Sequence, residues 1–273
     1  MVAGEELVTF PAAAAATRGR FWKFAHALEI GPSQIISPTG EWLPLIRRLP
    51  VASAKRIALS FDDGPTVHST RAIVNLLHDY HAKATFFLSG ERVAENPDLA
   101  ELLVEAGHDV FGHGWEHVRY KTPEQVIANI DRVERLLQEY RSTPRPYLVR
   151  LPYAEGRRIQ WVHRAIRQWN PAAQVAYWTH CLEDWEIPAM HQARAGLEAA
   201  CSVKVDALMA RPDLDGAIIL LHEDAYDVAS PLAKDVAPVL LENLLKRFSN
   251  LGFTFSPIIP WKRRGLKSRF ILY

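Results

Sequence analysis

Short apolar runs alternate with amphipathic segments from Arg56 onward, and this alternation constrains the fold more than any other feature of the chain. The runs have the length of buried strands and the segments between them carry helix signals, which is typical of repeated βα units around a mostly parallel sheet. We expect seven strands, at residues 57–61, 84–88, 108–111, 147–151, 175–179, 217–221 and 253–255. The sequence therefore predicts one α/β domain, either barrel-like or doubly wound.

Two of the intervening helices have clear boundary signals. Asn96-Pro97 opens one helix, which Gly107 can close. Thr122-Pro123-Glu124-Gln125 is typical of a capping box with proline at the first helical position. The apolar residues that follow it form one helical stripe: Val126, Ile130, Val133 and Leu137. Since no repeat or low-complexity linker divides residues 56–257, we expect a single domain there.

The two ends of the chain differ from this domain. Residues 1–50 contain an alanine run and four prolines, and we treat them as an N-terminal extension of uncertain structure. Ser37-Pro38-Thr39-Gly40 is a turn signal between Ile35-Ile36 and Trp42-Leu43, which permits a hairpin packed beside the main domain, although we favour the interpretation that this segment is structural padding. The main domain is assigned to residues 51–260, and residues 261–273 form a basic tail that we expect to be solvated.

Composition excludes several classes of partner. The 273 residues include 32 Lys and Arg against 31 Asp and Glu, a formal net charge of +1, so no global field favours nucleic acid. No apolar stretch is long enough to cross a bilayer and none resembles a signal-peptide core, so we expect no transmembrane segment and a cytoplasmic location. Cys181 and Cys201 form neither a disulfide framework nor a zinc motif. The oligomeric state is not readable.

Polar segments stand where α/β folds collect their reactive side chains, just beyond the carboxyl ends of the strands. The segments are Asp62-Asp63-Gly64-Pro65, His113-Gly114-Trp115-Glu116-His117, Arg150-Leu151-Pro152-Tyr153, Asp184-Trp185 and His222-Glu223-Asp224. We expect these segments, distant in sequence, to converge at one edge of the sheet.

Each segment is ambiguous on its own. An acidic pair before Gly-Pro is common turn chemistry and is usually solvated. His113 and His117, four residues apart, can share one face of a helical turn and offer two imidazoles to a metal, although such a pair is more often a coincidence of surface or core. Two histidines combined with one aspartate, however, form a catalytic type of zinc set with open positions for water and substrate.

Together, these segments resemble the signatures of the polysaccharide deacetylase (NodB-homology) family, carbohydrate esterase family four. The resemblance runs in order through residues 60–66, 96–117, 150–153, 184–185 and 220–222, and it spans most of residues 56–257. It implies a distorted (β/α) barrel of about seven parallel strands. It also implies metal-dependent removal of an acyl group, acetyl or formyl, from an N-acylated amino sugar.

The resemblance assigns a metal site and a base. Asp63, His113 and His117 would bind one divalent ion, for which we expect zinc, and Asp62 would be the general base. This division suits the chemistry, because a metal lowers the pKa of water and a neighbouring carboxylate can take the proton. Arg150 would hold Asp62 and tune its pKa.

The remaining roles concern the leaving group and the acyl group. His222 would be the general acid that protonates the departing amine, and Asp184 would orient His222 and keep it protonated. The backbone N–H of Tyr153 would stabilise the developing oxyanion. Trp185 and Leu220 would line a small apolar pocket for the acyl methyl group.

Three positions depart from the family pattern. Gly114 replaces a serine or threonine, so a hydroxyl that steadies the metal loop is missing. Cys181, after an uncommon His180, stands where many members carry an acid; we favour drift over a changed ligand shell, and Asp184 is the weakest assignment for this reason. Glu223 replaces the more usual Asp or Asn after the motif histidine.

Two alternative functions stay open. One is a carbohydrate-binding pseudoenzyme, although intact Asp62, Asp63, His113, His117 and His222 argue against it. The other is hydrolysis of a non-sugar amide or imide on the same scaffold. For the leading hypothesis we expect a soluble oligosaccharide or activated precursor as substrate, with Trp22 or Trp42 of the extension as a stacking surface at one side of the cleft.

Overall fold

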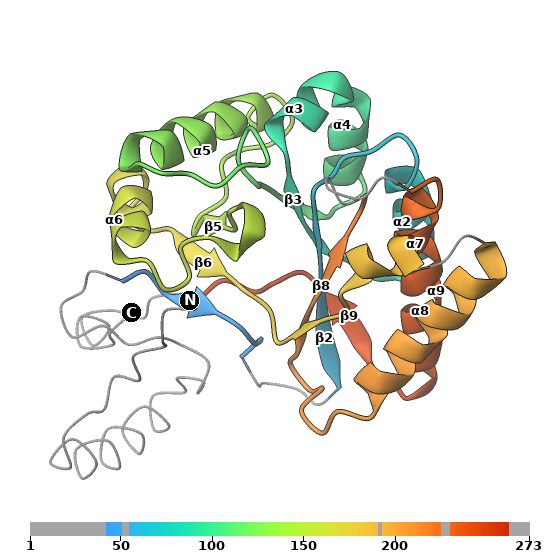
Figure 1. Cartoon of the computed structure of the whole chain (residues 1–273). Helices are drawn as coiled ribbons and strands as arrows, with labels where there is room; N and C mark the ends of the chain where they lie inside the picture. The colour runs from blue at the N-terminus through green and yellow to red at the C-terminus, as the bar shows by residue number, and fades with distance from the viewer. Residues whose placement is uncertain (1–41, 51–54, 191–192, 225–229, 262–273) are drawn as a thin grey trace, which may run out of the picture. The chain divides into compact units, whose positions relative to one another are not determined.

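The computed structural model describes residues 42–50, 55–190, 193–224 and 230–261 (Figure 1). Its strands form two parallel sheets. The larger sheet has the order β4 (Asp109–Gly112), β3 (Thr85–Leu88), β2 (Arg56–Asp62), β8 (Ile218–His222) and β7 (His180–Cys181), with β9 (Thr254–Ser256) also pairing with β2. The smaller sheet has the order β1 (Leu45–Ile46), β6 (Gln174–Ala176) and β5 (Leu148–Val149).

The α/β class and the parallel strands confirm the predicted architecture, with one difference in how the barrel is built. No hydrogen-bonded ladder joins the two sheets into a closed barrel within the part of the chain that the structure describes. The strand predicted at residues 175–179 is interrupted: Val175 and Ala176 lie in β6, residues 177–179 are in no strand, and β7 begins only at His180, so the chain divides here between the two sheets. The division occurs because Tyr177 N–H donates to Ile46 in the smaller sheet, whereas Thr179 N–H donates to Ile218 in the larger one.

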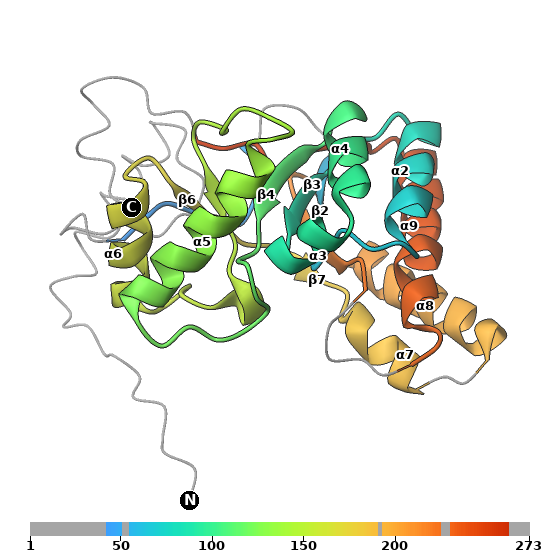
Figure 2. The ribbon, with the colours of Figure 1, turned by 90° about the horizontal axis from the view of Figure 1, so that it is seen from above.

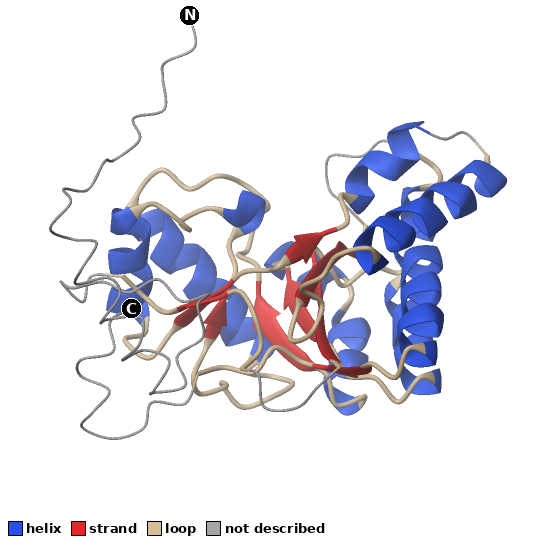
Figure 3. Ribbon diagram, turned by 90° about the horizontal axis from the view of Figure 1, so that it is seen from below, coloured by secondary structure: helices blue, strands red, loops and turns tan. Residues whose placement is uncertain are grey.

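Helices surround these strands, as Figure 3 shows with helices in blue and strands in red. The elements are α2 (Thr70–Asp79), α3 (Gly90–Glu95), α4 (Pro97–Glu105), α5 (Pro123–Leu137), α6 (Gln160–Trp169), α7 (Ile187–Met190), α8 (Arg194–Met209) and α9 (Ala233–Asn250), with single 3-10 turns η1 (Pro152–Ala154) and η2 (Asp184–Glu186). Helices α2, α8 and α9 lie together beside the larger sheet, and α5 and α6 pack side by side near the smaller one (Figure 2).

Alternate residues of the larger sheet face two different cores. In β2, Ile57, Leu59 and Phe61 pack in the outer core with side chains of α2 and α9. Ala58 faces the inner core, which it shares with residues of the smaller sheet. The strands are therefore buried on both faces, which explains their nearly continuous apolar sequences. Asp62 continues the inner-facing alternation at the end of β2, and its Cα partner across the ladder is His222.

The predicted helix signals act largely as expected. Asn96 precedes α4 with Pro97 at the first turn, and Gly107 follows its end with a φ of 76°. At α5, Thr122 Oγ1 accepts the N–H of Gln125 at 3.3 Å, which is one half of the capping box. The Gln125 side chain accepts the N–H of Lys121 instead of that of Thr122.

Only one arm of the possible hairpin before β2 lies within the described residues. Its Ile35-Ile36 arm and Trp22 lie outside the described residues, and Trp42-Leu43 is not a strand. Leu45–Ile46 instead forms β1, which pairs in parallel with β6 and was not predicted. Trp42 lies against α6, with its ring 4.6 Å from that of His163. No described helix is long and apolar enough to cross a bilayer.

Candidate active site

Three predicted metal ligands converge at the carboxyl ends of β2 and β4. Asp63 Oδ1 lies 3.5 Å from His113 Nε2 and 3.3 Å from His117 Nε2. One possible ligand atom from each residue lies within 4.8 Å of the other two. The side chains are almost completely buried, so the arrangement is a compact internal cluster rather than a solvated surface group.

The turn after β2 explains how two consecutive carboxylates reach one site. Side chains of consecutive strand residues normally point to opposite faces. Asp63, however, has a φ of 71°, in the left-handed region that aspartate tolerates better than most residues. As a result His113 Nε2 faces both carboxylates, at 3.5 Å from Asp63 Oδ1 and 4.0 Å from Asp62 Oδ2.

The two histidines do not share a helical turn, and that expectation is wrong. They lie on an irregular loop that follows β4. Gly114 has a φ of 92°, which takes the chain off a right-handed helical path directly after His113. The loop nevertheless brings the two imidazole rings to a centroid separation of 5.7 Å with an interplanar angle of 28°.

The protonation states of the cluster suit a cation. His113 Nδ1 donates to the carbonyl of Arg150 at 3.0 Å, which leaves the Nε2 lone pair directed at the cluster. Burial lowers the pKa of His113 to about 4, so the ring is neutral near pH 7. Burial raises the pKa of Asp63 to about 7 in the absence of an ion, although the charge of His222 opposes this.

One carboxylate oxygen of the cluster provides independent support for a cation site. Asp63 Oδ1 is buried and accepts no hydrogen bond from the described residues. A buried acceptor in this state is costly unless a donor or a cation satisfies it. Two imidazole nitrogens and one carboxylate oxygen are ligands that zinc accepts in catalytic sites. The residues present therefore fit a divalent ion.

Asp62 is held by a buried arginine, as the sequence predicts. Arg150 is 2% exposed, and its Nη1 donates to Asp62 Oδ1 at 2.7 Å and to Ser60 Oγ at 2.9 Å. Its remaining N–H groups donate to the backbone carbonyls of Ala176 and Tyr177. The guanidinium is thus anchored on β2, on β6 and on the residue that follows β6, and it fixes the direction of the Asp62 carboxylate.

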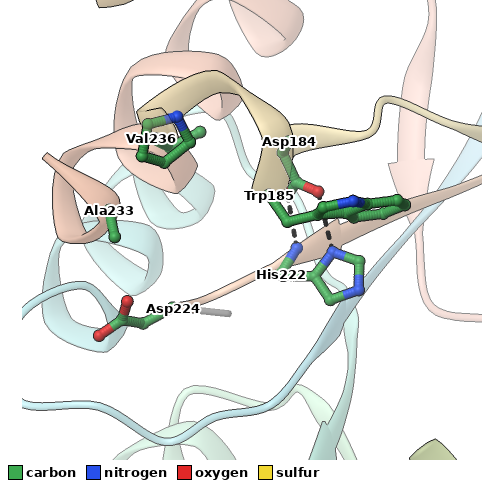
Figure 4. Close-up of a pocket in the computed structure, with 7 residues that line it drawn as sticks. Asp184, Trp185, His222, Asp224, Ala233 and Val236 are labelled. Carbon is green, nitrogen blue, oxygen red and sulfur yellow. Dashed lines mark hydrogen bonds and ion pairs between the residues drawn. The ribbon is translucent and has the colours of Figure 1, made fainter. Parts of the chain in front are cut away.

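Asp184 holds His222 through two contacts. Asp184 Oδ1 lies 2.8 Å from His222 Nδ1, and Oδ2 accepts the backbone N–H of His222 at 2.6 Å (Figure 4). Burial alone would lower the pKa of His222, but the carboxylates of Asp184, Asp63 and Asp62 outweigh it and raise the pKa to about 9. The imidazole is therefore protonated near pH 7, as a general acid requires.

A pocket opens beside this pair. Its walls are formed by Asp184, Trp185, Pro188, His222, Asp224, Ala233 and Val236. The Trp185 ring stands edge-on to His222 with centroids 5.0 Å apart (Figure 4). Leu220 is buried two residues before His222 and does not line this pocket. The two residues predicted to hold the acyl methyl group are therefore not brought together there.

Tyr153 lies beside His117, one of the three residues of the metal-type cluster formed by Asp63, His113 and His117. It is in η1 with a φ of 57° and a ψ of 23°, a left-handed conformation directly after Pro152. Its ring lies 4.5 Å from that of His117, with the Arg119 guanidinium 4.4 Å above it, and the residue is 41% exposed. The residue borders the cluster, so the predicted oxyanion role of its N–H is compatible with this position.

The hydroxyl of Tyr120 fills the space that a side chain at position 114 would occupy. A Cβ at this position would lie 2.0 Å from the hydroxyl of Tyr120. That hydroxyl donates to the carbonyl of Glu116, within the loop that carries both histidines. The loop is therefore tied by a tyrosine hydroxyl that occupies the space beside Gly114.

The other uncommon residues, His180 and Cys181, do not join the metal-type cluster. His180 Nε2 lies 3.2 Å from Asp213 Oδ1. Burial raises the pKa of the Cys181 thiol to about 12, so it is not a thiolate near pH 7. Cys181 is also absent from the group of potential ligands. These features favour drift over a changed ligand shell.

Sequence reasoning missed two residues that support the site. Ser60 Oγ accepts a hydrogen bond from Arg150 and donates one to the Ile219 carbonyl at 3.1 Å. Its position two residues before Asp62 could have indicated this supporting role. Arg92, on α3, donates from Nη1 to the carbonyls of Asp63 and Asp224 at 2.7 Å each. Nothing in its local sequence marks Arg92, because both acceptors are backbone groups from other parts of the chain.

A parallel α/β fold with acidic and histidine side chains gathered at the carboxyl ends of its strands is an architecture that carries enzymatic sites. Comparison with known proteins gives the family. A family model described as polysaccharide deacetylase matches residues 51–169. The chitooligosaccharide deacetylase of Rhizobium leguminosarum bv. trifolii is 30% identical over 176 residues, which cover 62% of this chain and 72% of that protein. The chain belongs to the polysaccharide deacetylase family.

Two further matches set the scope of this similarity. The peptidoglycan-N-acetylglucosamine deacetylase PgdA of Listeria monocytogenes is 29% identical over 206 residues, 75% of this chain and 38% of that protein. This chain therefore matches well under half of that longer relative. The solved structure of peptidoglycan deacetylase PdaC from Bacillus subtilis is 25% identical, with a TM-score of 0.59 over 76% of this chain and 89% of that one.

Proposed function

We propose that this chain is a metal-dependent hydrolase that removes the N-acetyl group, or an N-formyl group, from an amino sugar in an oligosaccharide or glycan precursor. The observation that carries the proposal is the cluster of Asp63, His113 and His117 together with two neighbouring groups at the same strand ends. These are Asp62, held by Arg150, and His222, held by Asp184. A divalent ion bound by the cluster would polarise the amide carbonyl and lower the pKa of water.

Asp62 is the proposed general base. Its Oδ2 is directed toward the cluster, 4.0 Å from His113 Nε2, while Oδ1 is occupied by Arg150. One oxygen is thus available to take a proton from the attacking water, and the other keeps the carboxylate in place.

His222 is the proposed general acid. An amide nitrogen leaves poorly as an anion, so the reaction needs a proton on that nitrogen when the C–N bond breaks. Nδ1 of His222 faces Asp184, which leaves Nε2 as the nitrogen that can deliver a proton to the substrate. The backbone N–H of Tyr153, whose ring lies beside His117, is the proposed donor to the oxyanion.

Acyl release measured with and without divalent ion tests this function. The substrates are short N-acetylglucosamine oligomers, their N-formyl counterparts, insoluble chitin and peptidoglycan, each assayed with zinc and after chelation. A small cyclic imide is added to represent non-sugar substrates. We expect zinc-dependent release from the oligomers, and loss of that release in Asp62→Asn.

Two results would contradict the proposal. Binding of oligomers without any acyl release, in the zinc-loaded protein, would favour a carbohydrate-binding protein without turnover. Hydrolysis of the imide alone would favour the same chemistry on a non-sugar substrate. A clear preference for chitin or peptidoglycan would contradict only the expectation of a short, soluble substrate.

A further inference from the structure

A buried carboxylate supports the loop that carries Asp62 and Asp63. Glu223 follows His222, its side chain is fully buried, and its N–H donates to the Asp62 carbonyl at 3.0 Å. The carboxylate packs directly against Gly64, since a Cβ there would lie 1.8 Å from Glu223 Oε1. Gly64 therefore leaves the space that the Glu223 carboxylate fills.

Thr70, the first residue of α2, connects this carboxylate to the far end of the same loop. Its hydroxyl donates to Glu223 Oε2 and accepts the N–H of Thr66 at 2.8 Å. A hydroxyl has one donor and two acceptor sites, so both bonds can form at once. Residues 62–66 are thus held at the Asp62 carbonyl, at Gly64 and at the Thr66 N–H, all by Glu223 and Thr70.

The backbone conformation of Asp63 within this loop is one that is unfavourable without surrounding contacts. Asp63 has a φ of 71°, and a non-glycine residue in the left-handed region persists where its surroundings impose it. Arg92 adds one bond to the Asp63 carbonyl. Glu223 and Thr70 provide the contacts on both sides of Asp63.

We propose that Glu223 and Thr70 are positioning residues that keep residues 62–66 in the conformation that presents the Asp63 carboxylate to His113 and His117. The inference rests on the proposed role of Asp63 as a metal ligand. A ligand held in place loses little freedom when an ion binds, whereas a loosened loop must first be ordered. Removing the Thr70 hydroxyl therefore weakens ion binding without altering any ligand.

Thr70→Val tests the proposal, with Thr85→Val as a matched control. Thr85, on β3, is also fully buried, and its hydroxyl also accepts a backbone N–H at 2.8 Å, from Ile258. Three quantities are measured on the metal-free proteins: zinc affinity by competition with a chromophoric chelator, hydrogen exchange of the amides in residues 62–66, and thermal unfolding. Glu223→Asp is the second test variant, because its carboxylate is one methylene too short to keep both contacts.

We expect Thr70→Val and Glu223→Asp to lower zinc affinity by roughly 10- to 100-fold, the effect typical of groups that orient metal ligands. Both should speed amide exchange in residues 62–66. Thr85→Val should lower the unfolding temperature without either change. Equal zinc affinity and equal exchange in Thr70→Val and Thr85→Val would overturn the proposal. If the wild-type protein bound no zinc while Thr70→Val still loosened the loop, positioning would stand and the metal-dependent function would fall.

Discussion

Asp184 contacts His222 at both its ring and its backbone, with Oδ1 2.8 Å from Nδ1 and Oδ2 2.6 Å from the main-chain nitrogen. The carboxylate therefore sets both the position and the charge of the imidazole. The pKa of His222 is raised to about 9, so the proposed acid is protonated below that pH and loses its proton above it. For the wild-type protein we expect the alkaline limb of kcat/KM near pH 9.

Asp184→Asn should move this limb to lower pH. Removal of the negative charge lowers the pKa of His222, because the nearby carboxylate favours the protonated imidazole. The measurement is kcat/KM against pH on an N-acetylglucosamine oligomer. Asp213→Asn is the control, because Asp213 faces His180 at 3.2 Å. A profile that Asp184→Asn leaves unchanged would contradict the role of Asp184.

Substitutions of the proposed metal ligands should abolish ion binding, whereas substitution of the neighbouring Asp62 should affect turnover alone. His113→Ala combined with His117→Ala removes two of the three proposed ligands, so we expect loss of the bound ion and of activity together. Asp62→Asn keeps the shape of the side chain but not the proton acceptor. It should retain the ion and lose about 10²- to 10⁴-fold in kcat. Metal analysis of the purified variants checks both statements; a stoichiometric ion in the double variant would place the site elsewhere.

Arg150→Met should destabilise the fold strongly. The substitution leaves Asp62 buried without its cation, and breaking a buried ion pair in this way costs about 3–5 kcal/mol. Urea unfolding at pH 7 measures the change in the free energy of unfolding. Arg71→Met is the control, since its pair with Asp98 is exposed and should contribute less than about 1 kcal/mol. Similar losses for the two variants would contradict the central place of Arg150 in the core.

Gly114→Ser should lower stability, although serine is the residue that the family resemblance leads one to expect there. The position has a φ of 92°, and an added Cβ would meet the Tyr120 hydroxyl at 2.0 Å. Strain and overpacking of this kind cost about 1–3 kcal/mol each. Thermal unfolding of Gly114→Ser against Gly114→Ser/Tyr120→Phe separates them, because the second variant removes the clashing oxygen and should recover part of the loss. An unchanged unfolding temperature in the single variant would show that the loop tolerates a side chain there.

Local sequence patterns predict many of the strands and helix starts of this fold. The apolar runs of β2, β3 and β8 predict buried strands because their residues face a core on both sides. Asn96-Pro97 marks a helix start because proline suits the first helical turn, and Thr122 marks another because its hydroxyl caps a neighbouring backbone N–H. The residue types at the strand ends likewise predict which side chains meet, because parallel strands direct their carboxyl ends to one edge.

Features that depend on contacts between residues far apart in the sequence were decided only by the tertiary structure. The passage of the chain from β6 to β7 follows from the backbone bonds to Ile46 on one side and to Ile218 on the other, so no local pattern could predict it. The path of the loop between His113 and His117 depends on the space that Tyr120 occupies beside Gly114. Arg92 donates hydrogen bonds to backbone carbonyls, and because every residue has a carbonyl, the sequence does not indicate which ones it binds. Sequence thus determined which chemical groups are present and at which edge they gather, whereas their orientation, burial and charge came from long-range packing.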